Sequence, residues 1–266
     1  MKRNLLLFVA MMFVLSSVLS AQTVVRPFNG TNFDGWNFKG SGEHTWVIGR
    51  LQADATSFTV TPVPAAGAGQ RNLGAQAGAQ AGGGAGAQQR GGMTAMVNIV
   101  GAMRDRQNLP ARQGVDIYTE EKFGDCTVKL EFLITRGSNS GVYLMGEYEV
   151  QVFDSFAKAP DARLGQGDMG AIYSAAAPRR NAAGVPGTWQ TYEIEFVAPR
   201  FDAAGNKTAN AMFKRVVLNG VLIQENVEVQ GSTGGGLTGR EAATGPLMFQ
   251  GDHGPVAFRN IEIIVP

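Results

Sequence analysis

The sequence predicts an all-β protein whose strands form an antiparallel sandwich or barrel. Three observations support this prediction. From Gly114 to the end of the chain, short runs alternate apolar and polar residues, and turn residues separate the runs. Their regular spacing is typical of sandwiches and barrels, and βαβ units would instead place helical patterns between strands. Asn219-Gly220 lies between VVL and VLI, and Asn-Gly supplies the positive φ angles of a type I′ hairpin.

The individual strands follow from this pattern. TWVIGRLQAD, before Gly114, and GVDIYTEE, which begins at Gly114, are also predicted to be strands, whereas MVNIVGAMRD has a short amphipathic pattern that predicts a helix. After Gly114 the predicted strands are CTVKLEFLIT, GVYLMG, YEVQVFDS, GAIYSA, WQTYEIEFVA, AMFKRVVL, VLIQENVEV, GPLMFQ and VAFRNIEIIV.

Residues 65–92 interrupt the predicted domain with a low-complexity segment. Of these 28 residues, 24 are Gly, Ala or Gln, and Leu73 is the only large apolar one. Such a segment buries too little apolar surface to offset the entropy of ordering, so we expect a disordered surface loop. Too few strands precede it to form a unit of their own, so residues 22–266 are expected to form one domain.

The N-terminus reads as a secretory signal peptide over residues 1–21. Lys2 and Arg3 precede an apolar run, and small residues follow it, so the mature chain is expected to start near Gln22. No lipobox cysteine follows and no later segment is long and apolar enough for a membrane span. We therefore expect a protein without stable membrane insertion, secreted or located in a Gram-negative periplasm.

Net charge and cysteine content limit the binding partners and disulfides that the chain can have. Without Lys2 and Arg3 the chain has 21 Lys and Arg against 22 Asp and Glu, a net charge of −1. A chain so close to neutral has no electrostatic preference for nucleic acid. The single Cys126 excludes an intrachain disulfide, and its place in GDCTVKLEFLI predicts a buried strand residue.

The segment GEYEVQVFDS, residues 146–155, has polar residues on the side of a strand that faces away from its apolar residues. Glu147, Glu149 and Gln151 alternate with Tyr148, Val150 and Val152. The strand CTVKLEFLIT similarly places Lys129 and Glu131 opposite its apolar residues. If the two strands are neighbours, one concave polar surface would bear Lys129, Glu131, Tyr143, Glu149 and Gln151. The alternative is a solvated outer face of a sheet.

Two further features are candidates for a binding or catalytic site. Trp189 precedes QTYEIEF, and an aromatic ring on a polar face can stack on a sugar ring, although Trp is more often a core residue. His253 lies in the glycine-flanked loop Gln250-Gly251-Asp252-His253-Gly254, where an imidazole can act as acid, base or metal ligand, or simply form a surface turn. No G-x-S-x-G, Walker loop, H-E-x-x-H or paired CxxC motif is present.

Taken together, these blocks resemble the 3-keto-disaccharide hydrolase family, also described as 3-keto-glucoside 1,2-lyases and 3-keto-2-hydroxyglucal hydratases. The resemblance runs from Phe28 to Val265, apart from the Gly/Ala/Gln segment. The matching blocks are FNG with GW, DIYTEEKFGDCTVKLEF, NSGVYLMGEYEVQVFDS, GAIY, PGTWQTYEIEFVAPRFD, LNGVLI and GPLMFQGDHGPVAFRNIEI. The resemblance implies a concanavalin A-like β-sandwich of jelly-roll type.

The resemblance also implies a small-molecule carbohydrate substrate already oxidised at C3. A C3 ketone acidifies the C2 proton, so a base can form an enolate, the glycosidic oxygen leaves from C1, and water can then add. This route needs a base near C2, hydrogen-bond donors or a divalent metal at the C3 oxygen, and an acid at the leaving oxygen. We expect Glu149 or His253 to be the base and Lys129 and Gln151 to be donors.

The other expected site residues follow from the same matching blocks and from the predicted polar face. The expected substrate-binding residues are Lys129, Glu131, Asn139, Tyr143, Gln151, Tyr173, Trp189 and Gln250. Candidate ligands for a divalent metal are Glu131, Glu149, Asp252 and His253.

Two other functions remain open at this point. A noncatalytic, lectin-like carbohydrate-binding sandwich would have the same fold, because fold alone does not determine function. A conventional endoglucanase is the other alternative, since Glu147-x-Glu149-x-Gln151 is similar to the E-x-D-x-E strand of sandwich-type endoglucanases. Gln151 weighs against it, because an amide cannot serve as the acid.

Overall fold

The computed structural model describes residues 22–40, 44–63, 93–99 and 114–266. Within these ranges the chain has no helix and sixteen strands. The strands are β1 (Thr23–Val25), β2 (Trp36–Phe38), β3 (Trp46–Ala53), β4 (Phe58–Pro62), β5 (Thr94–Asn98), β6 (Ile117–Phe123), β7 (Cys126–Ile134), β8 (Asn139–Leu144), β9 (Tyr148–Phe153), β10 (Gln190–Val197), β11 (Arg200–Phe201), β12 (Lys207–Ala209), β13 (Ala211–Leu218), β14 (Val221–Val229), β15 (Gly245–Phe249) and β16 (Val256–Val265).

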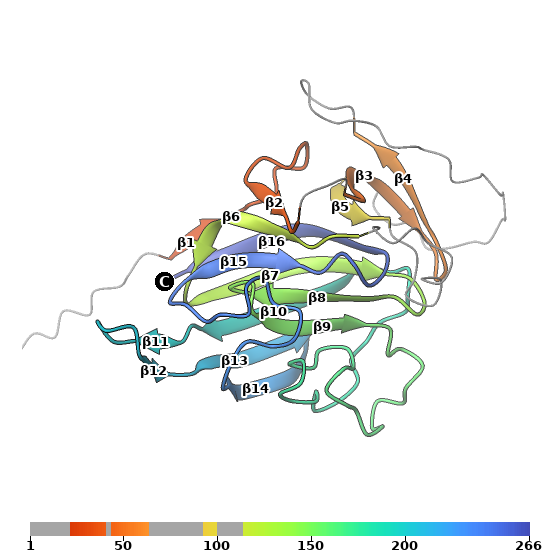
Figure 1. Cartoon of the computed structure of the whole chain (residues 1–266). Coiled ribbons are helices and arrows are strands. Elements are labelled where there is room, and N and C mark those ends of the chain that lie inside the picture. Colours follow the sequence, from red (N-terminus) through yellow and green to blue (C-terminus); the bar gives the residue numbers. More distant parts are fainter. Residues whose placement is uncertain (1–21, 41–43, 64–92, 100–113) are drawn as a thin grey trace, which may run out of the picture.

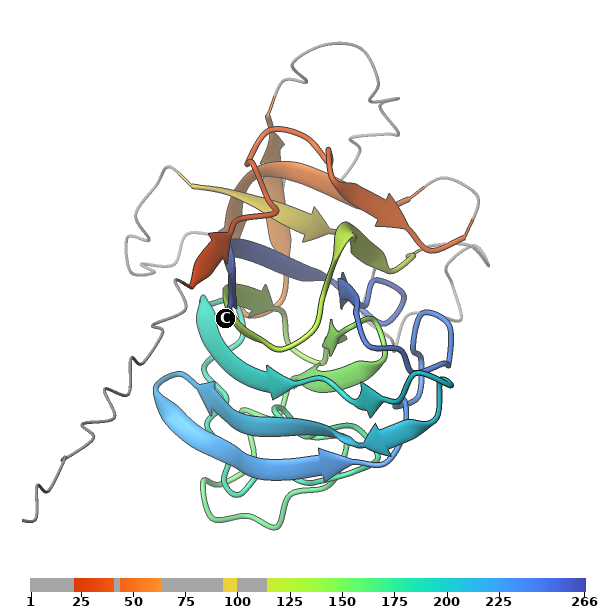
Figure 2. The ribbon, with the colours of Figure 1, turned by 90° about the vertical axis from the view of Figure 1, so that its left-hand side faces the viewer.

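Two antiparallel sheets form the sandwich, which confirms the predicted fold class. The nine-stranded sheet has the order β14-β13-β10-β7-β16-β5-β3-β4, with β1 paired to β16, and the five-stranded sheet has the order β2-β6-β15-β8-β9. Figure 1 shows one sheet in front of the other, and Figure 2 shows β10, β13 and β14 side by side. A short ribbon of β11 and β12 completes the set. The sandwich has the concanavalin A-like architecture that the resemblance implied.

The core lies between the two sheets, where alternate residues of facing strands meet. Val128, Leu130 and Phe132 of β7 are buried with Val142 of β8 and Val150 of β9. Cys126 is buried at the start of β7, as predicted, and burial raises the pKa of its thiol to about 12. The thiol therefore stays neutral and packs as a small apolar group.

The hairpin between β13 and β14 has the predicted turn. Asn219 and Gly220 have φ angles of 52° and 79°, and Leu218 pairs with Val221 across them. Asn219 also donates from its side chain to the Ala182 carbonyl at 2.9 Å. The turn therefore fixes the register of the two strands and tethers a neighbouring loop.

Two predicted elements are wrong. The segment MVNIV contributes Met96, Val97 and Asn98 to β5, a central strand between β3 and β16, and not to a helix. The backbone of β5 pairs with two neighbours and Met96, Val97 and Asn98 are buried, so tertiary contacts outweigh the weak helical pattern. The segment GAIYSA is not a strand either, since Ile172 makes only isolated bridges to Val150 and Ala176.

The remaining expectations for the N-terminal half lie outside the described residues. They concern the signal peptide at 1–21, the low-complexity segment at 65–92 and the C-terminal part of the predicted helix. Among the residues that are described, no helix is long and apolar enough to cross a membrane.

Candidate active site

The outer face of the five-stranded sheet carries polar side chains that are nevertheless buried. Tyr143 of β8 lies directly opposite Glu149 of β9, and Gly141 lies opposite Gln151. Their strand neighbours face the core, so these side chains point to the other side of the sheet. Glu149 is only 2% exposed and Gln151 only 4%. Two loops cover this face, which explains why polar groups on an outer face are shielded from water.

The Glu149 carboxyl group has an unusually high proton affinity. Its pKa is raised to about 8, first because burial removes it from water, and then because the negative charges of Asp116 and Asp252 oppose its ionisation. A hydrogen bond with the Tyr143 hydroxyl acts in the opposite direction, and the Gln151 side-chain nitrogen donates to Oε1 at 3.0 Å. A carboxyl group with a pKa in this range can accept a proton near neutral pH.

Gly141 provides the space that the Glu149 side chain occupies. A Cβ atom at position 141 would lie 2.2 Å from Glu149 Oε1 and 2.9 Å from its carboxyl carbon. The carboxyl group thus folds across the neighbouring strand where only a glycine leaves room. Gly141 also accepts a hydrogen bond from Gln250 N at 3.0 Å, which joins β8 to the next loop.

Residues 231–239, here called the glycine flap, cover the site from one side. Thr233 donates from its backbone nitrogen to the Glu147 carbonyl at 2.8 Å, and Leu237 donates to the Gly146 carbonyl at 2.7 Å. Thr233 Oγ1 also accepts a hydrogen bond from Glu149 N at 3.0 Å. A Cβ at Gly235, whose φ is +81°, would lie 2.7 Å from the Tyr143 hydroxyl oxygen. The flap approaches Tyr143 this closely because it is built from glycines.

Glu147 fastens the far end of the glycine flap. Its carboxylate accepts hydrogen bonds from Thr238 N at 2.8 Å, from Thr238 Oγ1 at 2.7 Å and from Gly239 N at 3.0 Å. These contacts use both carboxylate oxygens of a residue that is only 4% exposed. Glu147 is therefore an anchor for the flap and not a partner of Glu149.

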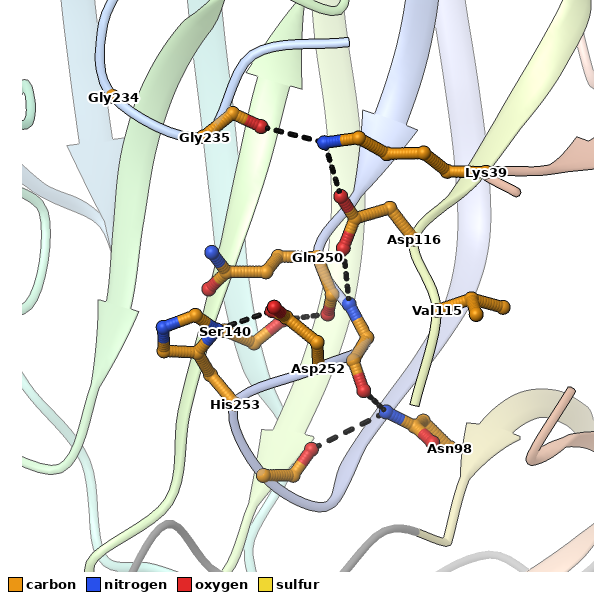
Figure 3. Close-up of polar contacts among 12 residues, drawn as sticks. Lys39, Asn98, Val115, Asp116, Ser140, Gly234, Gly235, Gln250, Asp252 and His253 are labelled. Atoms are coloured by element: carbon orange, nitrogen blue, oxygen red, sulfur yellow. Dashed lines mark hydrogen bonds and ion pairs between the residues drawn. The ribbon is translucent and has the colours of Figure 1, made fainter. Parts of the chain in front are cut away.

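Residues 250–254, here called the histidine loop, border the site on another side. Ser140 donates to the Gln250 carbonyl at 2.8 Å, and the Asp252 carboxylate contacts Nδ1 of His253 (Figure 3). Gln250 Nε2 points to the Tyr143 hydroxyl at 3.4 Å. Gln250 Oε1 is buried and has no hydrogen-bond partner, which is unusual for a buried acceptor and marks it as a group that a ligand could satisfy.

The structure brings most of the predicted site residues together. Asn139 accepts from the Gln151 amide at 3.2 Å, Tyr173 donates from its backbone nitrogen to the Glu149 carbonyl at 3.1 Å, and the Tyr173 ring lies against the flap. The residues gathered around one face are Asn139, Tyr143, Glu149, Gln151, Tyr173, Gln250, Asp252 and His253.

Three predicted residues lie elsewhere, so the expectation of one shared polar surface is wrong. Lys129, Glu131 and Trp189 belong to the nine-stranded sheet or its edge, and Lys129 and Glu131 point away from the core on the opposite outside of the sandwich. Lys129 pairs with Glu193 at 3.5 Å. Glu131 accepts a hydrogen bond from Arg259 at 2.7 Å, and the Arg259 guanidinium lies 3.8 Å from the centre of the Trp189 ring.

An open groove of about 700 Å³ follows this outer face of the nine-stranded sheet, with Lys129, Glu131 and Glu193 among its lining residues. Its charged side chains are already in ion pairs: Lys129 with Glu193, Arg26 with Glu262 at 2.6 Å, and Glu131 with Arg259. The buried carboxyl group, the unpartnered Gln250 oxygen and the covering loops are all on the five-stranded sheet. That face is therefore the better candidate for chemistry.

The four predicted metal-ligand candidates do not form one set. Glu131 is on the opposite face from Glu149, and among the described residues no three His, Cys, Asp or Glu side chains are arranged to hold a metal ion. Asp252 and His253 remain neighbours, but their contact is with each other.

Sequence reasoning did not identify Lys39 and Asp116, which lie beside this site. Lys39 Nζ contacts Asp116 Oδ2 at 3.1 Å, and Asp116 Oδ1 accepts from Gly251 N at 3.0 Å (Figure 3). Burial is the main cause that raises the pKa of Asp116. Both residues adjoin short strands whose alternation carries no sign of a polar site.

A match to a family model gives the class of protein, a carbohydrate-active enzyme with a sandwich fold. The chain belongs to the family of 3-keto-α-glucoside 1,2-lyase-like domains, whose family model matches residues 23–264. No curated protein matches the chain.

Two solved structures from Parabacteroides distasonis ATCC 8503, each described as a proposed glycosyl hydrolase, are similar to this chain. The first is 22% identical with a TM-score of 0.53, covering 94% of this chain and 93% of that one. The second is 16% identical with a TM-score of 0.50, covering 90% and 92%. At these identities the two structures support the shared fold.

Proposed function

We propose that this protein cleaves the glycosidic bond of 3-keto-glucosides by elimination, with Glu149 as the base. The observation that carries the proposal is the Glu149 carboxyl group, which is buried and has a pKa raised to about 8. General-base catalysis is most efficient when the pKa of the base lies near the working pH. An ordinary exposed carboxylate would be a much weaker base for a carbon acid.

The proposed reaction balances without an oxidant or reductant. The Glu149 carboxylate takes the C2 proton, and the C–H electrons form an enolate with the C3 oxygen. The enolate collapses to a C1=C2 double bond, the bond from C1 to the glycosidic oxygen breaks, and the leaving oxygen takes a proton. The product is a 2-hydroxy-3-keto-glucal. Addition of water, with hydroxyl to C1 and a proton to C2, would give the 3-keto sugar and a net hydrolysis.

The neighbouring side chains suggest roles for this reaction. Because Gln151 donates to the Asn139 side-chain oxygen, the Asn139 NH₂ group points away from Gln151 and is our proposed donor to the C3 oxygen. His253, with Nδ1 held by Asp252, keeps Nε2 for the proton of the leaving oxygen. A divalent metal at the C3 oxygen is the alternative electrophile, and a chelator separates the two.

A conventional retaining endoglucanase fits the site poorly. That mechanism needs two carboxyl groups about 5 Å apart that flank the bond. Glu147 is engaged by Thr238 and Gly239, and the next position on the strand face is the amide of Gln151. A lectin-like module would need no buried base, so the environment of Glu149 favours an enzyme.

The experiment compares 3-keto-trehalose with trehalose, each incubated with the purified chain lacking residues 1–21, with and without EDTA. We expect ultraviolet absorbance of the enone or release of 3-keto-glucose from the oxidised sugar alone. Cleavage of trehalose at a similar rate would disprove the elimination. Binding of several 3-keto-glycosides without turnover would support the lectin-like alternative.

We also propose that the chain is exported, on the grounds of its N-terminal pattern. N-terminal sequencing of the protein from the periplasm or medium of a Gram-negative expression host should find a start near Gln22. A chain that keeps Met1 and stays in the cytoplasmic fraction would contradict this.

A further inference from the structure

The ion pair of Lys39 and Asp116 connects the glycine flap to the histidine loop. Lys39 Nζ donates to the Gly235 carbonyl at 3.1 Å and to the Gly236 carbonyl at 3.2 Å, both in the middle of the flap. It also contacts Asp116 Oδ2 at 3.1 Å, and Asp116 Oδ1 accepts from Gly251 N in the histidine loop. Figure 3 shows this chain of contacts from Gly235 through Lys39 and Asp116 to the loop.

We propose that Lys39 and Asp116 are a positioning pair, which fixes the glycine flap and the histidine loop relative to Glu149. The effect of this pair on catalysis rests on the proposed function. Its structural and electrostatic parts can be measured without substrate.

The geometry of Lys39 supports the positioning role. An ammonium group has three protons, and three acceptors surround this one: a carboxylate oxygen and two flap carbonyls. Asp116 is 6% exposed, so it cannot exchange this partner for water without cost. Loss of Lys39 would leave two flap carbonyls without their donor and a buried carboxylate without its cation.

The pair is also the link that ties the flap to the sheet edge farthest from Glu149. Lys39 follows β2 and Asp116 precedes β6, at one side of the five-stranded sheet, whereas Glu149 lies on β9 at the other. Glu147 and Gly146, at the β9 side, hold both ends of the flap, and the Tyr143 hydroxyl on β8 donates to its Gly234 carbonyl at 3.1 Å. The flap therefore spans the polar face, and Lys39 holds its middle at the side of the sheet opposite to Glu147 and Gly146.

The electrostatic role follows from the groups that face Glu149 on each neighbouring element. They are Tyr143 on β8, Asp116 before β6, Asp252 and His253 in the histidine loop, and the neutral Gln151 and Thr233. Asp116 and Asp252 both oppose ionisation of Glu149, and Lys39 partly neutralises Asp116. Removing the Asp116 charge would leave Lys39 as an uncompensated cation, and both changes lower the pKa of Glu149.

The test uses Asp116→Asn, Lys39→Met and Lys39→Arg. Lys158 and Asp168 provide a matched control pair, since their contact at 2.6 Å joins a 45% exposed lysine side chain to a 6% exposed aspartate, against 36% and 8% for Lys39 and Asp116. The control variants are Lys158→Met and Asp168→Asn. Circular dichroism first confirms that each variant is folded.

Two measurements on the free protein decide the inference. A ¹³C NMR titration of the Glu149 carboxyl should show its midpoint lowered by on the order of one pH unit in Asp116→Asn and unchanged in Asp168→Asn. Hydrogen exchange at the amides of Thr233 and Leu237 should be about tenfold faster in Lys39→Met, restored in large part by Lys39→Arg, and unaffected in Lys158→Met. If Asp116→Asn does not fold, the Lys39 variants still test the flap.

Kinetics then connect the pair to the reaction. In Asp116→Asn the pH profile of kcat/KM should move to lower pH with the Glu149 midpoint. An unchanged midpoint, together with flap exchange in Lys39→Met equal to that in Lys158→Met, would overturn the inference. If the free-protein results hold but the wild type does not cleave 3-keto-glucosides, the proposed function fails and the positioning pair stands.

Discussion

Replacing Glu149 with Gln should stabilise the protein at alkaline pH, and the same substitution removes the proposed base. The carboxyl pKa is 4.5 in the unfolded chain and about 8 in the folded protein. Between these values the unfolded state ionises and the folded state does not. The free energy of unfolding of the wild type therefore falls as pH rises through this window, by about 1.4 kcal/mol per pH unit.

Over the full window the loss amounts to about 5 kcal/mol at pH above 8, and to about 3 kcal/mol at pH 7. Glu149→Gln has no such ionisation, so its stability advantage over the wild type should grow from pH 5 to pH 8. Urea unfolding at each pH measures this difference, with Glu228→Gln, an exposed glutamate on β14, as the control. A difference between Glu149→Gln and wild type that stays constant across the window would refute the argument for a buried, protonated carboxyl group.

Three further substitutions test the layout of the site. Gly141→Ala should displace the Glu149 carboxyl group and lower kcat by about 10²-fold, because a misplacement of about 1 Å has that effect. The control Gly167→Ala should leave turnover unchanged, because no atom lies within 4 Å of its new Cβ. Gln250→Leu removes a buried acceptor that has no partner, so it should raise the free energy of unfolding by about 1 kcal/mol and increase KM. A lower stability with an unchanged KM would contradict the ligand-facing role of Gln250. Lys129→Ala, on the opposite side of the sandwich, should leave kcat/KM within twofold of wild type, and a tenfold loss would return that face to consideration.

The sequence was a good guide to which side of a strand a residue faces. Strict alternation placed Glu149 and Gln151 opposite Val150 and Val152, and the Asn-Gly dipeptide marked the hairpin at 219 and 220. Both signals are local, because strand geometry and turn conformation depend on adjacent residues. They needed no knowledge of the partner strands.

The alternation of apolar and polar residues does not predict which sheet a strand joins. For this reason the predicted surface shared by Lys129 and Glu149 was wrong. β7 and β8 are separated by only a short turn, yet β7 pairs with β10 and β16 in one sheet and β8 pairs with β9 and β15 in the other. The polar faces of the two strands therefore point to opposite sides of the sandwich. Lys129 and Glu149 looked like neighbours in the sequence but are separated by the whole core.

The alternation of apolar and polar residues also did not predict the loops that cover Glu149. The sequence pattern makes no prediction for residues 231–239, and only the structure shows that their glycines approach Tyr143 and Glu147 too closely for any side chain. The elevated proton affinity of Glu149 depends on this cover and on Asp116, a residue 33 positions earlier in the chain. Such long-range contacts leave no mark on the spacing of residues around Glu149.

The most direct test of the central claim is the kinetic isotope effect on cleavage of a 3-keto-glucoside deuterated at C2. If Glu149 removes the C2 proton in a rate-limiting step, the deuterated substrate should react severalfold more slowly, and kcat/KM should rise with pH to a plateau above about 8. Equal rates for the two substrates, with deuterium retained at C2 in the products, would show that the C2 proton stays in place and would contradict elimination.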